Sequence, residues 1–284
     1  MLLLIFTGAA LASFVGFVIA EVFLDIPLLT DPSLLDDLSN PELVPALRVM
    51  QVLQAVGMLI LPAIIYLRIS SSESEVKMLF RSPQRQPIMI GVSVFLVAFP
   101  FINYLAQWNA GIELPTDIGD WMRAKEETAG ALTQSFLDMP NIGFLLFNLF
   151  MIAVLPAVGE ELIFRGIIQR GLGRQFRNPH VAIWLAAIIF SAIHMQFFGF
   201  VPRMLMGVAM GYLFYWSGNL WYPTIAHFTN NAMAVILSYG IQHGSIRPEI
   251  ESMGIENITV AGFSLVGCFM LLYLFKQQQA VGSQ

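Results

Sequence analysis

Six polar residues and one phenylalanine beside them lie within or at the end of long apolar stretches, where ionisable side chains need a physical reason. On insertion scales, each charged group placed inside a membrane helix costs about 2.5–3.5 kcal/mol. The seven residues fall into three groups on three separate stretches and indicate a functional site. They are Glu160, Glu161 and Arg165, then Phe190 and His194, then His227 and Asn231.

Helical geometry separates the two adjacent glutamates. Glu161 precedes Arg165 by four residues, which is the favourable order for an ion pair along a helix. Glu160 points about 100° away around the same helix and has no such partner. Because burial favours the neutral form of a carboxyl group, Glu160 is the better candidate for acid–base chemistry.

The residue types allow two kinds of hydrolytic site. A carboxylate and an imidazole around one water molecule can generate a nucleophile. A second imidazole and a carboxamide are donors suited to a developing oxyanion. Alternatively, Glu160, His194 and His227 match the ligand set of a catalytic Zn²⁺ site with one position open for water. The residues leave both possibilities open.

Composition predicts that these residues sit in a membrane protein. Hydrophobic residues form 57% of the 284 positions and charged residues only 12%, about half the share in a soluble domain. A helix needs about 20 apolar residues to cross a bilayer. Eight candidate spans follow, because window 204–246 is long enough for two helices joined at Ser217-Gly218-Asn219. The windows are 1–20, 49–67, 86–112, 139–159, 178–202, 204–246 and 257–275.

We therefore expect an all-α bundle of about eight transmembrane helices in a single membrane domain, 1–284, with the catalytic core at 139–240. An amphipathic helix at the outer interface is expected over 114–137, with Asp117 as its N-terminal cap. A plain solvent loop is the alternative for this segment. Its apolar stripe is formed by Ile118, Trp121, Met122, Ala129, Leu132 and Phe136.

The placement of Lys and Arg predicts that both termini are cytoplasmic and that the chain is a multi-pass protein of the cell membrane. Eight basic residues then fall on the inner side and five in outer loops. The inner ones are Arg68, Lys77, Arg81, Arg85, Arg170, Arg174, Arg177 and Lys276; the outer ones are Arg48, Arg123, Lys125, Arg203 and Arg247. In this orientation Glu160, His194, His227 and Asn231 converge about 12–20 Å from the cytoplasmic face.

At these residues the sequence resembles the CAAX protease and bacteriocin-processing family (CPBP, or Abi) of intramembrane proteases. The family pattern is Glu-Glu-x-x-x-Arg, then Phe-x-x-x-His, then His-x-x-x-Asn or Asp, each on its own transmembrane helix. Here Glu160-Glu161 with Arg165, Phe190 with His194, and His227 with Asn231 match the three motifs in order.

The resemblance implies a role for each residue. Glu160 and His194 would activate the hydrolytic water, and His227 with Asn231 would stabilise the oxyanion. Glu161 and Arg165 would support the site, and Phe190 would line it. The substrate would be a membrane protein or peptide. Zn²⁺ remains a possible cofactor beside a metal-free glutamate mechanism.

Three other function classes have less support in the sequence. A non-catalytic immunity factor or scaffold in the membrane is the main alternative. A transporter lacks the expected inverted repeat, and nucleic-acid binding lacks a basic tract. Some polar residues are expected to stand outside the site: Asn230 on another helix face, His180 and His243 at the surface, and the single cysteine, Cys268, facing lipid or core.

Overall fold

The computed structural model describes residues 1–38, 40–113 and 115–281, and within these ranges the chain forms helices and no strands. Six helices in the described ranges are long and apolar enough to cross a membrane by length and composition. The predicted polytopic helical bundle is confirmed. The six helices are Leu2–Phe23, Pro41–Ser70, Arg85–Ala110, Ile142–Phe176, Phe197–Ser217 and Ile258–Ala280.

Two of the six long helices consist of several helical segments joined end to end. We call them the second rod (Pro41–Ser70) and the fourth rod (Ile142–Phe176), after their order among the six. The second rod joins η2 (Pro41–Leu43), α2 (Val44–Gln54), the π-helical η3 (Ala55–Ile60) and α3 (Leu61–Ser70). The fourth rod joins α7 (Ile142–Asn148), the π-helical η4 (Leu149–Val154), α8 (Leu155–Ile163), the π-helical η5 (Phe164–Gln169) and α9 (Arg170–Phe176). Pro62 and Pro156 stand at the start of α3 and α8, each directly after a π segment. Proline has no N–H to continue the α-helical ladder, so the hydrogen bonds shift at these points.

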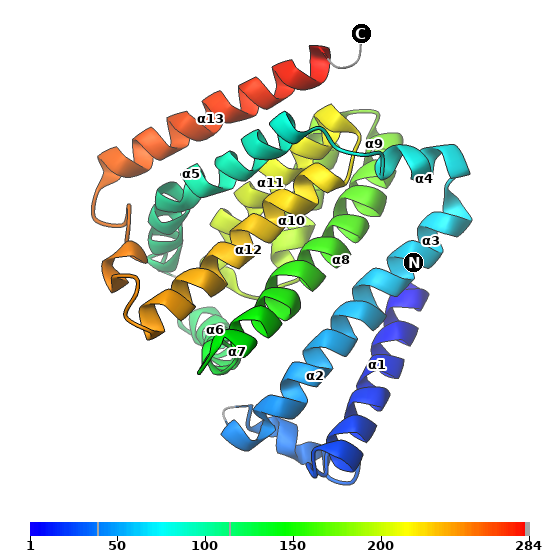
Figure 1. Cartoon of the computed structure of the whole chain (residues 1–284), viewed down its shortest axis with the longest axis vertical. Helices are drawn as coiled ribbons and strands as arrows, with labels where there is room; N and C mark the ends of the chain where they lie inside the picture. The colour runs from blue at the N-terminus through cyan, green and yellow to red at the C-terminus, as the bar shows by residue number, and fades with distance from the viewer. Residues whose placement is uncertain (39, 114, 282–284) are drawn as a thin grey trace.

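The helices pack side by side in a continuous sequence (Figure 1). α13 (Ile258–Val281) lies along α5 (Arg85–Ala110), which also packs against α12 (Trp221–Gln242). α8 lies between α12 and η3, and α1 (Leu2–Phe23) covers the far side of α2 and η3. The largest buried apolar cluster runs through this stack, and the second and fourth rods meet inside it. Its larger buried members include Phe95, Phe164, Phe190, Leu213, Phe214 and Phe275.

The predicted span 178–202 is wrong. α10 (Pro179–Ala192) has only 14 residues, beginning behind the cap of Asn178 and ending before His194. Met195 turns the chain at a φ of 55°, and η6 (Phe197–Gly199) leads into α11 (Phe200–Ser217). A hydropathy window could not locate this end, because the turn itself is largely apolar. The expected turn after Ser217 is confirmed, with Gly218 at a φ of 62°.

Close contact between α11 and its neighbours depends on two glycines four residues apart. A Cβ atom on Gly211 would lie 2.8 Å from Ile183 Cγ2, and one on Gly207 would lie 3.1 Å from Ala187 Cβ. The two glycine carbonyls accept hydrogen bonds from Arg165 and Gln169 of the neighbouring rod. Small residues at this spacing let helix backbones approach closely in a membrane.

The helix expected near 114–137 is present as α6 (Thr116–Leu137), which rules out the plain loop; Leu114 lies outside the described residues. Asp117 is not its cap, because Pro115 holds the cap position without a side-chain hydrogen bond. Its C-terminal end is buried through Phe136, and Arg48 Nη2 donates to three carbonyls there. α4 (Glu73–Leu79) joins α9 at the opposite end of the bundle through Glu75 and Arg174, 2.8 Å apart.

Candidate active site

The first structural element of the site is a buried ion pair on the fourth rod. Arg165 Nη1 donates to Glu161 Oε1 at 2.7 Å, and both side chains are almost completely shielded from solvent. A second guanidinium nitrogen, Nη2, donates to the carbonyl of Gly207 at 3.0 Å. The predicted Glu161–Arg165 pair is therefore present, and it ties α8 and η5 to α11.

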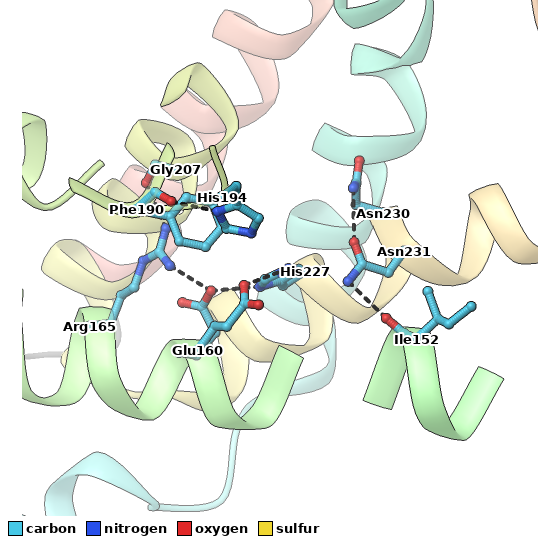
Figure 2. Close-up of polar contacts among 10 residues, drawn as sticks. Ile152, Glu160, Arg165, Phe190, His194, Gly207, His227, Asn230 and Asn231 are labelled. Carbon is cyan, nitrogen blue, oxygen red and sulfur yellow. Dashed lines mark hydrogen bonds and ion pairs between the residues drawn. The ribbon is translucent and has the colours of Figure 1, made fainter. Parts of the chain in front are cut away.

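His227 lies between the two glutamates. Its Nδ1 and Glu161 Oε1 are 2.8 Å apart, while its Nε2 and Glu160 Oε2 are 3.7 Å apart. Glu161, held ionised by Arg165, can only accept, so Nδ1 carries the hydrogen and the other ring nitrogen is directed at Glu160. Figure 2 shows this chain of contacts from the guanidinium to the second carboxylate. The single carboxylate oxygen shared by Arg165 and His227 fixes the ring's orientation.

Glu160 is more exposed than Glu161, and its carboxylate is free to accept a proton. Its side chain is 16% exposed, against 0% for Glu161. The 3.7 Å separation from His227 is longer than a hydrogen bond, and none links Glu160 to another described side chain. A carboxylate oriented this way can accept a proton from a group that enters the gap.

His194 lies just beyond the end of α10, in the turn, rather than on a transmembrane helix. Its Nδ1 lies 2.7 Å from the carbonyl oxygen of Phe190. A carbonyl only accepts, so Nδ1 is the protonated nitrogen and Nε2 is left with a free lone pair. In Figure 2 that second nitrogen lies on the ring edge facing Glu160 and His227. The end of the short helix α10 thus directs the Nε2 atom of His194, which can act as a base, toward Glu160 (Figure 2).

The ring of Phe190 is the common wall of these groups. It packs edge-to-face against His194 at 5.0 Å and against His227 at 6.0 Å between ring centroids. The guanidinium carbon of Arg165 lies over the same ring, 5.2 Å from its centre. Phe190 is 3% exposed, so it separates the ion pair from the half-buried His194. Its predicted place beside His194 is confirmed.

Asn231 lies one turn beyond His227 on α12 and contacts a different part of the fourth rod. Its Nδ2 donates to the carbonyl of Ile152 at 3.2 Å, and its Oδ1 accepts from Asn230 at 3.2 Å. Pro156, four residues after Ile152, has no N–H with which to complete the α-helical bond to that carbonyl. Asn231 therefore compensates for a break in the backbone ladder and retains one amide hydrogen for another acceptor.

Sequence reasoning missed Arg203, which it placed in an outer loop. The residue lies on α11, partly buried, close enough to Glu160 and His194 to interact with their charges. Two hydrogen bonds to Gln196, of 3.2 and 2.6 Å, hold its guanidinium. A basic residue just after a proline near a predicted span boundary was the available signal.

Four further residues were expected to lie outside the site: His180, His243, Cys268 and Asn230. His180 and His243 are exposed, as expected, with His180 Nδ1 near Tyr212 Oη. Cys268 is buried and its thiol donates to the carbonyl of Val94. Asn230 donates a hydrogen bond to Asn231.

The donors expected for Zn²⁺ do not converge. Among the described residues, no group of three His, Cys, Asp or Glu side chains is arranged to hold a metal ion. Nδ1 of His227 faces Glu161 and Nδ1 of His194 faces a backbone carbonyl, so each ring has only Nε2 left for a further partner. The residues therefore do not fit the expected zinc site, and no step below is derived through a metal.

The part of the chain that holds these residues matches a known protein family. Residues 142–233 match the family model described as type II CAAX prenyl endopeptidase Rce1-like. This segment begins with α7 and ends within α12, so it holds all three motifs. The resemblance to CAAX-type proteases is confirmed. The Rce1-like segment falls inside the core expected at 139–240.

One curated protein also matches part of the chain. The chain is 26% identical over 117 residues to the uncharacterized protein YpbD of Bacillus subtilis (strain 168). The match covers 40% of this chain and 55% of that protein, so the chain spans about half the length of this relative. No solved structure matches the chain significantly. The Rce1-like segment and the apolar helices together describe a multi-pass membrane protein.

Proposed function

We propose that this protein is an intramembrane endopeptidase that hydrolyses a peptide bond in a membrane-associated protein or peptide. The observation that carries the proposal is the contrast between the two glutamates. Glu161 is bound by Arg165 and His227, whereas Glu160 faces the imidazole across a 3.7 Å gap. The description of the matched family as endopeptidases supports the same chemistry.

Glu160 and His194 activate the water in this proposal. The water donates one hydrogen bond to the Glu160 carboxylate and another to Nε2 of His194. Its oxygen attacks the carbonyl carbon as its proton moves to Glu160. When the tetrahedral intermediate collapses, the C–N bond breaks and that proton passes to the leaving nitrogen. Atoms and charge balance without a further reactant.

His227 and Asn231 stabilise the oxyanion of that intermediate. When Nε2 carries a proton, the imidazole, held at Nδ1 by Glu161, donates to the oxyanion from Nε2, and Asn231 donates its remaining amide hydrogen. Preorganised donors of this kind typically account for about 10²–10³ in rate each. Glu161 and Arg165 position His227, and Phe190 keeps the pair dry. The protein resides in the cell membrane with both termini in the cytoplasm.

The first test is Glu160→Gln in purified protein reconstituted in lipid vesicles. The substitution keeps the side chain's shape and removes its basicity, so we expect cleavage of a fluorogenic peptide library to fall by at least about 100-fold. Cells carrying wild-type or Glu160→Gln protein are compared in parallel for changed termini of membrane proteins, which identifies natural substrates.

Glu73→Gln is the matched control, because Glu73 is exposed and pairs with Lys77 at the surface. It should retain full activity. Full activity in Glu160→Gln would overturn the catalytic role of this carboxylate. A folded wild-type protein that cleaves nothing and changes no terminus in cells would instead favour the non-catalytic immunity or scaffold function.

A further inference from the structure

Two adjoining hollows lie outside the candidate active site, at the end of the bundle that holds the C-terminal part of α13. One is a chamber of about 490 Å³ and the other is a groove of about 790 Å³. Trp216 and Lys276 line both, so the chamber and the groove adjoin at these two side chains. No member of the proposed catalytic set lines either hollow.

The chamber is basic and polar. Arg81 and Lys276 contribute its charges, and among the described residues no aspartate or glutamate lines it. Arg81 is fixed in place, because its Nη2 donates to the carbonyl of Ser217 at 2.8 Å and its own carbonyl accepts from Asn219 at 2.7 Å. Hydroxyl and amide groups of Ser82, Gln84 and Gln279 complete the lining. Such a chamber suits an anionic group.

The groove is apolar and has the length of one lipid leaflet. It runs between α5, α11 and α13, which pack against one another (Figure 1). Along α13 it extends from Lys276 to Leu265, about 17 Å at the rise of an α-helix. Half of the hydrocarbon core of a bilayer is about 15 Å thick. Tyr212, Trp216 and Tyr273 line it near the chamber, where aromatic residues of membrane proteins commonly meet the headgroup region.

We propose that the chamber and groove form a binding site for one anionic phospholipid. The phosphate of the headgroup lies between Lys276 and Arg81, and an acyl chain follows the groove past Cys268. Basic pockets between transmembrane helices bind anionic headgroups in this manner. Charge complementarity selects the lipid class, and the depth of the groove selects a lipid that resides in that leaflet.

The test measures lipid retention and does not depend on proteolysis. Purified protein is stripped of lipid and reconstituted in vesicles of equimolar phosphatidylglycerol and phosphatidylcholine with identical chains. Lipids that remain bound after extraction in mild detergent are counted by native mass spectrometry. Wild-type protein should retain phosphatidylglycerol preferentially, and Lys276→Gln should reduce that preference about fivefold, the effect expected for one basic residue near an anionic headgroup.

Lys77→Gln is the matched control, since it removes the same charge from an exposed residue of α4 that lines neither hollow. It should leave the preference unchanged. Ala98→Phe, which fills the groove with an apolar side chain, should lower retention of both lipids. Equal retention of the two lipids by wild-type protein, or equal losses in Lys276→Gln and Lys77→Gln, would overturn the proposal. Either result would leave the proposed peptidase activity untouched.

Discussion

Glu160 and Glu161 are neighbours in the sequence, yet their surroundings assign them different tasks. Glu161 contacts Arg165 and His227 through one oxygen, Oε1; its second oxygen, Oε2, is buried without a hydrogen-bond partner among the described residues. A buried charge pair contributes little net stability when intact, but breaking it leaves one charge uncompensated. Glu161 is therefore a positioning residue with a structural function as well.

Replacement of Glu161 by Gln should lower both stability and activity. Arg165 would remain buried without its counter-charge, at a cost of about 3–5 kcal/mol. Thermal unfolding in detergent measures this loss, and Glu160→Gln provides the comparison, with little change in unfolding temperature expected. Equal unfolding temperatures for Glu161→Gln and wild type would contradict the structural role of the pair.

His194 should behave in the opposite way. Its side chain is half-buried in a turn, and its one hydrogen bond among the described residues is to the carbonyl of Phe190, so His194→Gln should leave the unfolding temperature nearly unchanged. Peptide cleavage should fall by about 100-fold or more, because the acceptor nitrogen is lost. His180→Gln, an exposed histidine at the start of α10, is the control and should cleave normally. A fully active His194→Gln would remove this residue from the proposed mechanism.

Residue types and spacing predicted the Glu161–Arg165 pair because an i,i+4 contact depends only on local helical geometry. The same reasoning separated Glu160 from Arg165. Contacts between helices could not be obtained in this way. The attachment of Asn231 to Ile152 and the approach of Arg203 to Glu160 depend on how α12 and α11 lean on the fourth rod, which no local pattern specifies.

At the scale of elements, Pro156 interrupts the hydrogen-bond ladder of the fourth rod, and Asn231 of α12 donates to the carbonyl that the proline leaves unpaired. Asn231→Leu leaves the carbonyl of Ile152 without its donor and should lower the free energy of unfolding by about 1–3 kcal/mol. Pro156→Ala supplies a backbone N–H in the same place. In that background the cost of Asn231→Leu should shrink, which a double-mutant cycle in chemical denaturation measures.

Strict additivity of Pro156→Ala and Asn231→Leu would mean that the side chain and the proline do not act on the same carbonyl. The rod also illustrates where prediction from sequence fails. Composition located its apolar length and Pro156 marked the break after η4, but no proline marks the second π-helical turn, η5, which packs against α10 and α11. The early end of α10, at Ala192, is likewise not marked by the hydrophobic pattern of the sequence.

At the scale of the whole molecule, the basic residues assigned to the inner side gather at one end of the bundle. Arg170 and Arg174 reach Glu75 of α4, and Arg81 reaches the carbonyl at the end of α11. This clustering agrees with an asymmetric distribution of Lys and Arg across a membrane. The hydrophobic pattern predicted the bundle correctly, but two of the eight expected spans are not among the six long apolar helices of the described residues: α10 is too short, and α12, although 22 residues long, is not among the six.

The predicted topology can be measured with reporter fusions in a bacterial host. Green fluorescent protein fused after the C-terminus should fluoresce, and alkaline phosphatase fused there should be inactive. Alkaline phosphatase inserted at Ser252, in the connection between α12 and α13, should be active, because the predicted orientation puts that connection outside. The reverse pattern at both positions would invert the orientation.

The 14 residues of α10 also affect the surrounding lipid. They rise about 21 Å, about 9 Å less than the hydrocarbon core of a typical bilayer. A mismatch of this size is relieved by local thinning of the membrane or by strain in the short element. Longer acyl chains in the host membrane would increase this mismatch next to the turn that holds His194, so we expect the site to respond to bilayer thickness.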